Sequence, residues 1–343
     1  MMKRKSPIVN DSRLSGLAAR RRLGQVLVCD PANVKAFAGV DCDNAVVTLD
    51  AFYTDFRYIP MARRLVKGLA VRDISRLREA APRSGAGMRI GFESSIPHSR
   101  YLSLAKLFPR AKFVDISKQL GELRAVKSDA EISALRAAAK LNRAIWEEAR
   151  SRFSAGMTER DMARIIQVLM AGRGDGEAFP TIVCIGKNAA ECHHEPDGTV
   201  WDGREPVLVD MGVRLGGVCS DMTRNIVSRR PSPRYRQAYD LVRRAHDEAI
   251  AAARPGMTAK SLDKVARDII RNGGLGRRFG HSLGHGVGYE IHEAPTISKR
   301  CDTVLKEGMI FTIEPGVYIE GDFGIRIEDT VLLTASGCEI LTA

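Results

Sequence analysis

The sequence of 343 residues lacks several features, and each absence excludes a class of protein. No stretch approaches the roughly 18 consecutive apolar residues of a membrane-spanning helix. The segment Met1–Arg13 is polar and basic with no apolar core, so we expect no secretory signal. The seven cysteines are scattered and never form a Cys-X-X-Cys pair. This pattern argues against a disulfide framework and a cysteine zinc site, and it predicts a protein of the reducing cytoplasm.

Signatures of nucleic-acid binding are also missing, although the net charge is +12. Seven basic residues and one acidic residue among the first 24 account for half of that charge. The remaining positive charge is spread in small clusters, without interleaved aromatic residues and without a helix-turn-helix or RNA-binding motif. We therefore interpret the charge as a solvated basic face and a basic, partly disordered N-terminal tail.

The first part of the chain alternates short apolar runs with helix-like segments, which predicts a small α/β domain over residues 1–120. A second and larger domain is expected over residues 121–343. The predicted strands of the small domain are 25–29, 45–49, 88–92 and 112–116, and its predicted helices are 60–81 and 99–108.

The second domain contains a weak internal repeat. Ser128 and Glu131 form a capping box that opens a long helix. Residues 138–158 match residues 238–258 at eight of 21 positions, including a shared Gly-Met-Thr. Shared helical composition is an alternative explanation, but the common turn favours duplication. Each copy is expected to be a helix, a Gly-Met-Thr turn and a second helix, so that two α/β halves are related by a pseudo-twofold axis.

Four carboxylates and one histidine of the second domain lie in strand-like or glycine-rich sequence, where packing alone does not explain them. A buried carboxylate costs several kcal/mol unless it is paired or binds a metal. One inward-facing arginine, Arg326, is too few to pair with four acidic groups. Two divalent cations would balance the four negative charges. The five candidate ligands are Asp210, Asp221, His285, Glu314 and Glu328.

Five short motifs around these residues, in this order, make the chain similar to the M24 metallopeptidases. Residues 120–340 resemble the pita-bread fold of that family, and the whole chain resembles its Xaa-Pro aminopeptidase/prolidase branch. The N-terminal part resembles the family's creatinase-like domain more loosely. The motifs are Val209-Asp210-Met211-Gly212, Ser220-Asp221-Met222-Thr223-Arg224, Gly284-His285-Gly286-Val287-Gly288, Ile313-Glu314-Pro315-Gly316 and Ile325-Arg326-Ile327-Glu328-Asp329.

The resemblance implies a role for each ligand. Asp210 would hold one metal ion, His285 and Glu314 would hold the other, and Asp221 and Glu328 would bridge the pair. Carboxylate oxygens with one imidazole suit manganese, which we expect, with cobalt, zinc or iron as alternatives.

Catalytic roles also follow from the resemblance. Glu314 would accept the proton of the attacking water, while Arg326 would support the carboxylate cluster. His193 and His292 would contact substrate, and His281 would line the pocket. The family usually has proline before the first of these histidines, where this chain has Cys192.

Two local ambiguities concern the histidines. His194 directly follows His193 and could be mistaken for the substrate-contacting residue, although the register favours His193. His281 and His285 have the i, i+4 spacing of a helical metal site. The glycines around them predict a loop instead, in which the backbone approaches a ligand closely.

The predicted function is that of a cytoplasmic dinuclear metallopeptidase that removes an N-terminal residue followed by proline, in other words an Xaa-Pro aminopeptidase. The alternatives are an Xaa-Pro dipeptidase (prolidase), a general aminopeptidase and a non-catalytic pita-bread binding module. The binding module is disfavoured because all five ligands are present. The resemblance also suggests a homodimer, and it gives no reason to expect a membrane or nucleic-acid partner.

Overall fold

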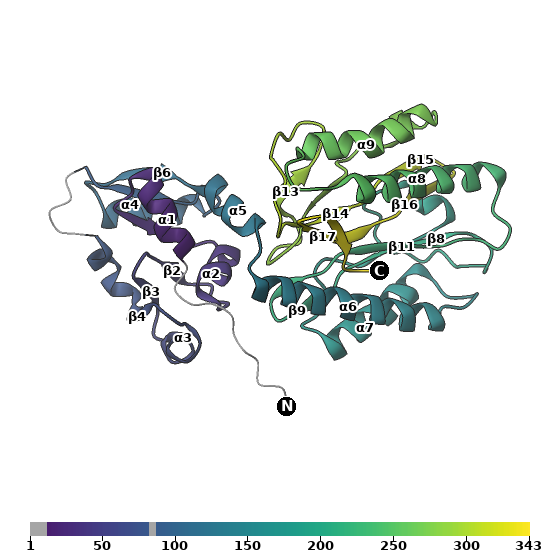
Figure 1. Ribbon diagram of the computed structural model, residues 1–343. Helices are drawn as coiled ribbons and strands as arrows, with labels where there is room; N and C mark the ends of the chain where they lie inside the picture. The colour runs from purple at the N-terminus through teal and green to yellow at the C-terminus, as the bar shows by residue number, and fades with distance from the viewer. Residues whose placement is uncertain (1–11, 82–86) are drawn as a thin grey trace. The chain divides into compact units, whose positions relative to one another are not determined.

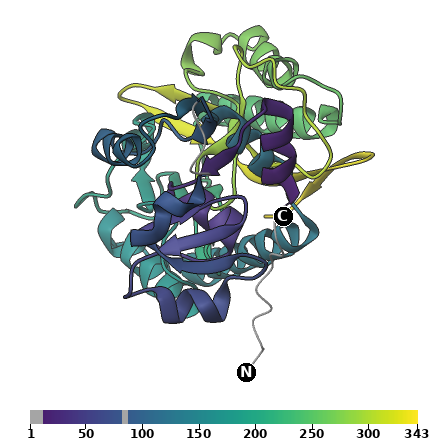
Figure 2. The same ribbon diagram turned by 90° about the vertical axis from the view of Figure 1, so that its left-hand side faces the viewer.

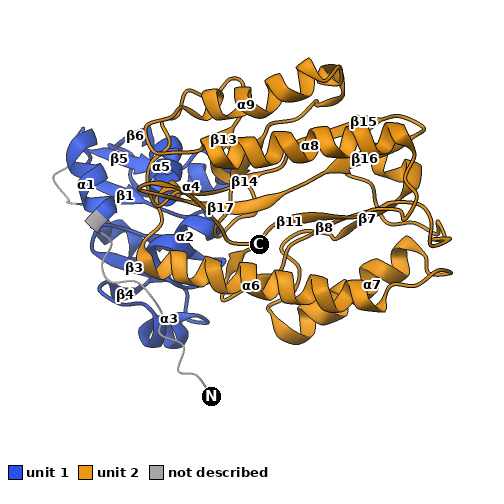
Figure 3. Ribbon diagram, turned by 45° about the vertical axis from the view of Figure 1, so that its right-hand side comes forward, with its two compact units in different colours: residues 1–124 blue, residues 125–343 orange. Residues whose placement is uncertain are grey.

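The computed structural model describes residues 12–81 and 87–343, which form two compact units of residues 1–124 and 125–343 (Figure 3). The sequence placed the domain boundary at 120/121. Residues 1–11, most of the predicted basic tail, lie outside the described residues. The described part begins with helix α1 (Ser12–Arg21). None of the described helices is long and apolar enough to cross a membrane.

Unit 1 contains two small sheets, whose strands and helices can be followed in the purple to blue part of Figures 1 and 2. The parallel sheet has the order β1 (Gln25–Leu27), β5 (Arg89–Phe92), β6 (Lys112–Asp115). The mixed sheet has the order β2 (Ala45–Val47), β3 (Ala51–Thr54), β4 (Ala70–Asp73). The other helices are α2 (Pro31–Ala38), α3 (Ile59–Leu65), α4 (His98–Leu107) and α5 (Ser117–Ala125), which continues into unit 2. These elements confirm the α/β prediction.

One predicted element of unit 1 is wrong. The helix expected over residues 60–81 ends at Leu65, and Gly68 then adopts a left-handed conformation with φ of 74°. Residues 70–73 become strand β4, which pairs in parallel with β3, and Ile74–Ala80 form a 3-10 helix capped by Asp73. The backbone is already extended at Val66, ahead of Gly68, and strand pairing then takes precedence over the local helical pattern.

The internal repeat of unit 2 is confirmed as two helical hairpins. Helices α6 (Asp129–Arg152) and α7 (Glu159–Arg173) form the first, and α8 (Pro233–Ala252) and α9 (Ala259–Asn272) form the second. The predicted capping box of Ser128 and Glu131 opens α6. Thr158 and Thr258 cap the second helix of each pair, after Gly156 and Gly256 turn the chain with φ of 94° and 87°.

Strands lie between the two helical hairpins of unit 2 (Figures 1 and 3). The first hairpin packs on the antiparallel strands β7 (Ile182–Ile185), β8 (Val207–Met211) and β11 (Met222–Ile226), in the order β11-β8-β7. The 3-10 helix η2 (Gly186–Ala190) follows β7, and β9 (Arg214–Leu215) pairs with β10 (Val218–Cys219).

The second helical hairpin covers the other strands. They are β12 (Gly284–Gly286), β13 (Glu293–Ile297), β14 (Ile310–Ile313), β17 (Asp329–Thr334) and β18 (Gly337–Ile340), in the order β13-β12-β14-β17-β18, with the hairpin of β15 (Gly316–Ile319) and β16 (Phe323–Arg326). A short 3-10 helix, η3 (Gly276–Arg278), follows α9. Each helical pair thus has its own apolar core against its own strands, as the two-halves prediction requires.

Candidate metal centre

The five candidate ligands come from strands, or from residues next to strands, in both halves of unit 2. Asp210 lies within β8, and Asp221 directly precedes β11. His285 is the middle residue of β12, Glu314 directly follows β14, and Glu328 lies between β16 and β17. Strand ends and short strands fix backbone direction, so these side chains converge without depending on a long loop.

Three of these ligands form a tight group. One potential metal-binding atom from each of Asp221, His285 and Glu328 lies within 4.8 Å of the other two. Nε2 of His285 is 3.5 Å from Oδ2 of Asp221 and 3.3 Å from Oε1 of Glu314. Glu314 therefore joins the group through the imidazole, with one oxygen facing the same nitrogen.

Asp210 is connected to this group through Arg326. Nη2 of Arg326 donates to Oδ2 of Asp210 at 2.6 Å, and Nε of Arg326 donates to the hydroxyl of Thr223 at 3.1 Å. That hydroxyl in turn donates to Oε2 of Glu328 at 2.6 Å. The other oxygen of Asp210 is buried and has no hydrogen-bond partner among the described residues. A buried carboxylate oxygen without a partner is the kind of atom that a cation would satisfy.

Electrostatics also fit a pair of divalent cations. Burial raises the pKa of Asp221 and of Glu328 well above the ordinary range. The next largest cause is a neighbouring negative charge, which is Glu328 in the case of Asp221 and Glu314 in the case of Glu328. Burial likewise raises the pKa of Asp210, against the opposing effect of Arg326. Among the residues that the structure describes, Arg326 is the single arginine or lysine ion-paired with these carboxylates. Oxygen donors with one imidazole match hard or borderline divalent metals, so the residues fit such ions.

Close backbone contacts explain the glycines beside His285. A Cβ atom on Gly284 would lie 1.9 Å from the carbonyl oxygen of Thr312, and one on Gly286 would lie 2.2 Å from that of Ala294. Strand β12 can therefore fit between its neighbours only as glycine at these positions. Nδ1 of His285 donates to the carbonyl of Gly286 at 3.1 Å, which leaves the lone pair of Nε2 available to a cation held beside the carboxylates. The segment is not helical, as predicted, but it is strand β12 rather than a loop, and its close backbone contacts are to neighbouring strands.

A hydrogen-bond chain continues from Arg326 to His281. Nη1 of Arg326 donates to the hydroxyl of Tyr318 at 2.9 Å, and Nε2 of His281 lies 3.0 Å from the same hydroxyl. Nδ1 of His281 donates to the carbonyl of Ser282. The sequence analysis did not assign a role to Tyr318 or Thr223. Thr223 lies inside a quoted motif, but a tyrosine in an apolar strand carries no comparable signal.

The remaining two predicted residues lie on the open side of the group. His292, in the loop between β12 and β13, is exposed, and its ring centroid lies 4.3 Å from that of His285 in an edge-on arrangement. His193, in the turn after η2, is also exposed. The pKa of His292 is lowered mainly by desolvation and then by the charge of His285, and His193 lies close enough to His292 to lower it further. His194 points elsewhere, to Glu159 at 2.8 Å.

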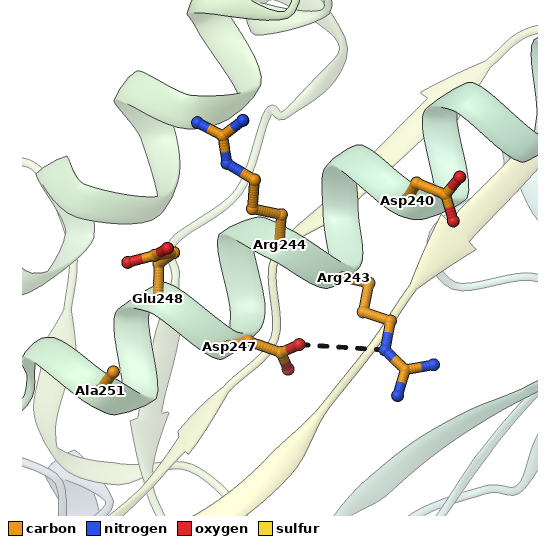
Figure 4. A pocket seen from close by; sticks show the side chains of 6 residues that line it. All are labelled: Asp240, Arg243, Arg244, Asp247, Glu248 and Ala251. Atoms are coloured by element: carbon orange, nitrogen blue, oxygen red, sulfur yellow. Dashed lines mark ion pairs between the residues drawn. The ribbon is translucent and has the colours of Figure 1, made fainter.

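A separate cavity of about 470 Å³ runs along α8 and shares no residue with this group (Figure 4). Its side chains are mostly charged, and Arg243 pairs with Asp247 at 3.9 Å. Charges of both signs on one helix face are typical of a solvated surface. The lining residues are Asp240, Arg243, Arg244, Asp247, Glu248 and Ala251.

Comparisons with known proteins agree with this geometry. Residues 133–335 match metallopeptidase family M24, and residues 12–126 match the creatinase/prolidase N-terminal domain. The Xaa-Pro dipeptidase of Pyrococcus horikoshii is 37% identical over 254 residues, which cover 74% of this chain and 72% of that protein.

Two solved structures extend the likeness over nearly the whole chain. The prolidase from Pyrococcus furiosus is 34% identical with a TM-score of 0.87, covering 96% of this chain and 98% of that one. The X-Pro aminopeptidase from Thermotoga maritima is 32% identical with a TM-score of 0.86, covering 95% and 97%. A family match over most of unit 2, relatives of this identity and a cluster of carboxylates around His285 lead to one conclusion: this chain is a member of metallopeptidase family M24, a hydrolase with a creatinase/prolidase N-terminal domain.

Proposed function

We propose that the protein hydrolyses the bond between a residue and a following proline, with the free Xaa-Pro dipeptide as its preferred substrate. The observation that carries this proposal is the convergence of four carboxylates and His285 in a chain whose relatives include Xaa-Pro dipeptidases. The sequence predicts an Xaa-Pro aminopeptidase, with the Xaa-Pro dipeptidase as an alternative. The relatives favour the alternative.

The proposed ligand assignment keeps the roles implied by the resemblance. Asp210 would hold one ion, His285 and Glu314 would hold the second, and Asp221 and Glu328 would be shared by both. Manganese is the proposed metal, with cobalt, zinc or iron as alternatives. Two such ions would lower the pKa of a water molecule and polarise the scissile carbonyl.

Glu314 is the proposed proton acceptor. Its Oε1 accepts a hydrogen bond from the hydroxyl of Thr312 at 3.0 Å and faces Nε2 of His285 at 3.3 Å, so the carboxylate is held in one orientation. Burial alone would raise the pKa of Glu314. The hydrogen bond and charge of His285, together with the charges of His281 and Arg326, outweigh burial and lower this pKa. A lowered pKa suits the role of a general base, which must be ionised to accept a proton.

His193 and His292 are the proposed substrate contacts. Both are exposed. His292 lies edge-on against the ring of His285, and His193 lies near His292 from a different loop, so a peptide can reach them without rearrangement of the core. The nitrogen released from an Xaa-Pro bond is a secondary amine that must gain a proton, which an imidazole or Glu314 can supply. Arg326 acts by holding Asp210 and Tyr318 in place, and His281 supports Tyr318.

Proline specificity has a physical basis in the substrate. A peptide bond to proline has no N–H, and its ring fixes φ, so a suitable pocket offers no acceptor at that position. We expect kcat/KM for Xaa-Pro to exceed that for Xaa-Ala by about tenfold or more, which corresponds to about 1.4 kcal/mol in transition-state binding. Equal rates for the two would support a general aminopeptidase instead.

The likeness to the Thermotoga maritima structure keeps the Xaa-Pro aminopeptidase as a second candidate. Manganese-loaded protein assayed against Ala-Pro, Ala-Pro-Ala and Ala-Ala-Ala separates the candidates. Faster cleavage of Ala-Pro supports the dipeptidase, and faster cleavage of Ala-Pro-Ala supports the aminopeptidase. A protein that binds no divalent metal and cleaves none of the three would contradict both.

Two further features belong to the proposal. All seven cysteines are free, which supports a reducing compartment such as the cytoplasm. A homodimer remains the expected assembly from the family resemblance, and light scattering of the purified protein tests it.

A further inference from the structure

Glu159 is a completely buried carboxylate outside the candidate metal centre. It is the first residue of α7, and both of its oxygens accept two hydrogen bonds each. The partners of these oxygens all lie between residues 185 and 197. They are the backbone N–H of Ile185 at 2.7 Å, Nδ2 of Asn188 at 3.0 Å, Nε2 of His194 at 2.8 Å and the backbone N–H of Asp197 at 3.0 Å.

The ring of His194 is held from two sides. Nε2 faces Oε2 of Glu159 at 2.8 Å, and Nδ1 faces Oε2 of Glu191 at 3.2 Å. A carboxylate only accepts hydrogen bonds, so both ring nitrogens need a proton and the geometry selects the imidazolium. The three acidic groups that act on the ring are Glu159 from α7 and Glu191 and Asp197 from its own segment; desolvation opposes them, but they raise the pKa of His194.

A metal ion is not needed to explain this cluster. Ligand atoms of Glu159, His194 and Asp197 lie within 4.8 Å of one another, which is compatible with ion binding. However, each oxygen of Glu159 already accepts two N–H donors, and Asp197 accepts from the backbone of Thr199 at 2.7 Å. A fully satisfied carboxylate has no reason to recruit a cation.

The cluster lies one residue from His193. On one side of His193, Nη1 of Arg326 reaches the carbonyl of Cys192 at 3.5 Å. On the other side, the ring of His194 is bound to Glu159. Residues 191–197 lie outside helices and strands, and among the described residues the His193 side chain makes no hydrogen bond that would fix it. Its position therefore depends on its two neighbours.

The second half of unit 2 provides an internal control. Its Gly-Met-Thr turn binds a later segment through the same backbone hydrogen bonds as the first, yet Ala259 replaces Glu159 and is equally buried. Docking of the turn therefore does not require a carboxylate at this position. The equivalent bonds are Gly156 N to Trp201 O (2.9 Å) and Gly256 N to Leu305 O (2.9 Å), and Glu159 N to Thr199 O (3.1 Å) and Ala259 N to Thr303 O (2.9 Å).

We propose that Glu159 and His194 form a positioning pair that holds the backbone of His193 in place for substrate. The inference rests on the proposed function, because it takes His193 as a substrate contact. It assigns His194 a role in this chain that differs from that of the adjacent histidine. The pair touches no reacting atom and acts only through the 191–197 segment.

The test compares His194→Ala, His194→Gln and a matched control, Glu195→Gln. Glu195 is exposed in the same segment, and no hydrogen bond or ion pair of its side chain is seen among the described residues. All variants are measured in the metal-loaded full chain, with metal content, kcat and KM for Ala-Pro, and amide hydrogen exchange of the peptide covering 191–197. Glu159→Gln is not used alone, because a buried mismatch of donors can prevent folding.

We expect His194→Ala to lower kcat/KM by about tenfold or more, mainly through kcat, since misplacing a contact weakens the transition state. Metal content stays at the wild-type level, and exchange in 191–197 rises while exchange in β7 and β8 does not. Gln can still donate one hydrogen bond, so His194→Gln retains most of the activity.

Wild-type exchange in His194→Ala would overturn the anchor, and faster exchange with unchanged kcat/KM would overturn the positioning role. A loss of activity of the same size in Glu195→Gln would overturn the assignment to His194. An inactive wild-type protein counts against the proposed function, whereas the exchange comparison needs no substrate and still decides the anchor.

Discussion

The two halves of unit 2 share a scaffold but differ in the chemistry they carry. Each half is a helical hairpin with a Gly-Met-Thr turn, packed on antiparallel strands. The first half supplies Asp210 and Asp221, while the second supplies the single imidazole, His285, together with Glu314 and Glu328. The two halves differ in their side chains rather than in their backbone fold. The candidate site between them is therefore asymmetric, although the scaffold is repeated.

The same contrast holds away from the ligands. The buried N-terminal position of the second helix is Glu159 in one hairpin and Ala259 in the other. Apolar packing suffices in the second half. In the first half, a charged group at the same place binds the segment that carries His193. The buried carboxylate thus serves residues 185–197 of the first half, and the second half carries alanine at the equivalent position.

The largest expected effect tests whether both halves are needed for the metal pair. Asp221→Asn removes a bridging carboxylate of the first half, and Glu328→Gln removes one of the second. Each variant should lose activity by about a hundredfold or more, together with bound metal, because a bridging carboxylate serves both ions. Activity assays and metal analysis of the purified protein measure this. Glu320→Gln, an exposed change in the same unit, should leave both unchanged; near-normal turnover in either bridging variant would refute the five-ligand assignment.

A variant with a comparable loss of activity but a smaller loss of metal separates proton transfer from metal binding in the second half. Glu314→Gln keeps an oxygen ligand but removes the proton acceptor, so kcat should fall by about a hundredfold. Some metal should remain bound, unlike in the bridging variants. Retention of wild-type kcat would exclude Glu314 as the base.

The pH dependence of stability distinguishes Glu159 from Ala259. Desolvation alone would lower the pKa of His194 in the folded state. The hydrogen bonds to Glu159 and Glu191 outweigh it, so the pKa is raised. A raised pKa contributes stability that is fully present below the unfolded pKa of about 6.5 and is lost as pH rises through the folded value.

Urea unfolding of the wild type and of His194→Gln at pH 5.5 and 8.5 measures this contribution. The stability difference in favour of the wild type should be larger at pH 5.5. A difference that grows towards pH 8.5 would show that His194 is neutral in the folded protein.

The smallest effect compares the two helix caps. Thr158 and Asp161 cap α7 reciprocally, whereas the hydroxyl of Thr258 accepts from Ser261 without a carboxylate in return. Replacing either threonine by alanine should lower the free energy of unfolding by about 1 kcal/mol. Thr158→Ala should cost more, because Asp161 also loses its hydroxyl donor. Equal losses would show that the caps are equivalent.

The sequence by itself determined most of the elements of unit 2 and pointed to the residues of the candidate site. The capping box of Ser128 and Glu131, the Gly-Met-Thr turns and the strand-like runs around the carboxylates are local patterns, and local sterics and hydrogen bonding produce the same structure from them. Four acidic groups in apolar runs also indicated a shared site, since the cost of burying a charge does not depend on knowing the fold.

Only the tertiary structure decided which distant groups meet. Residues 70–73 became a strand because β3 was available as a partner, against the local helical pattern. Tyr318 is linked to the site by a hydrogen bond from Arg326, and Glu159 is linked to the segment of His193 by a hydrogen bond with His194. Neither residue stands in a distinctive motif. Hydrogen-bond partners far apart in sequence depend on how the strands pair and how the helices pack. From the sequence alone, a carboxylate at the first position of a helix, such as Glu159, is expected to be an ordinary exposed charge. Only the tertiary structure shows which segment buries it.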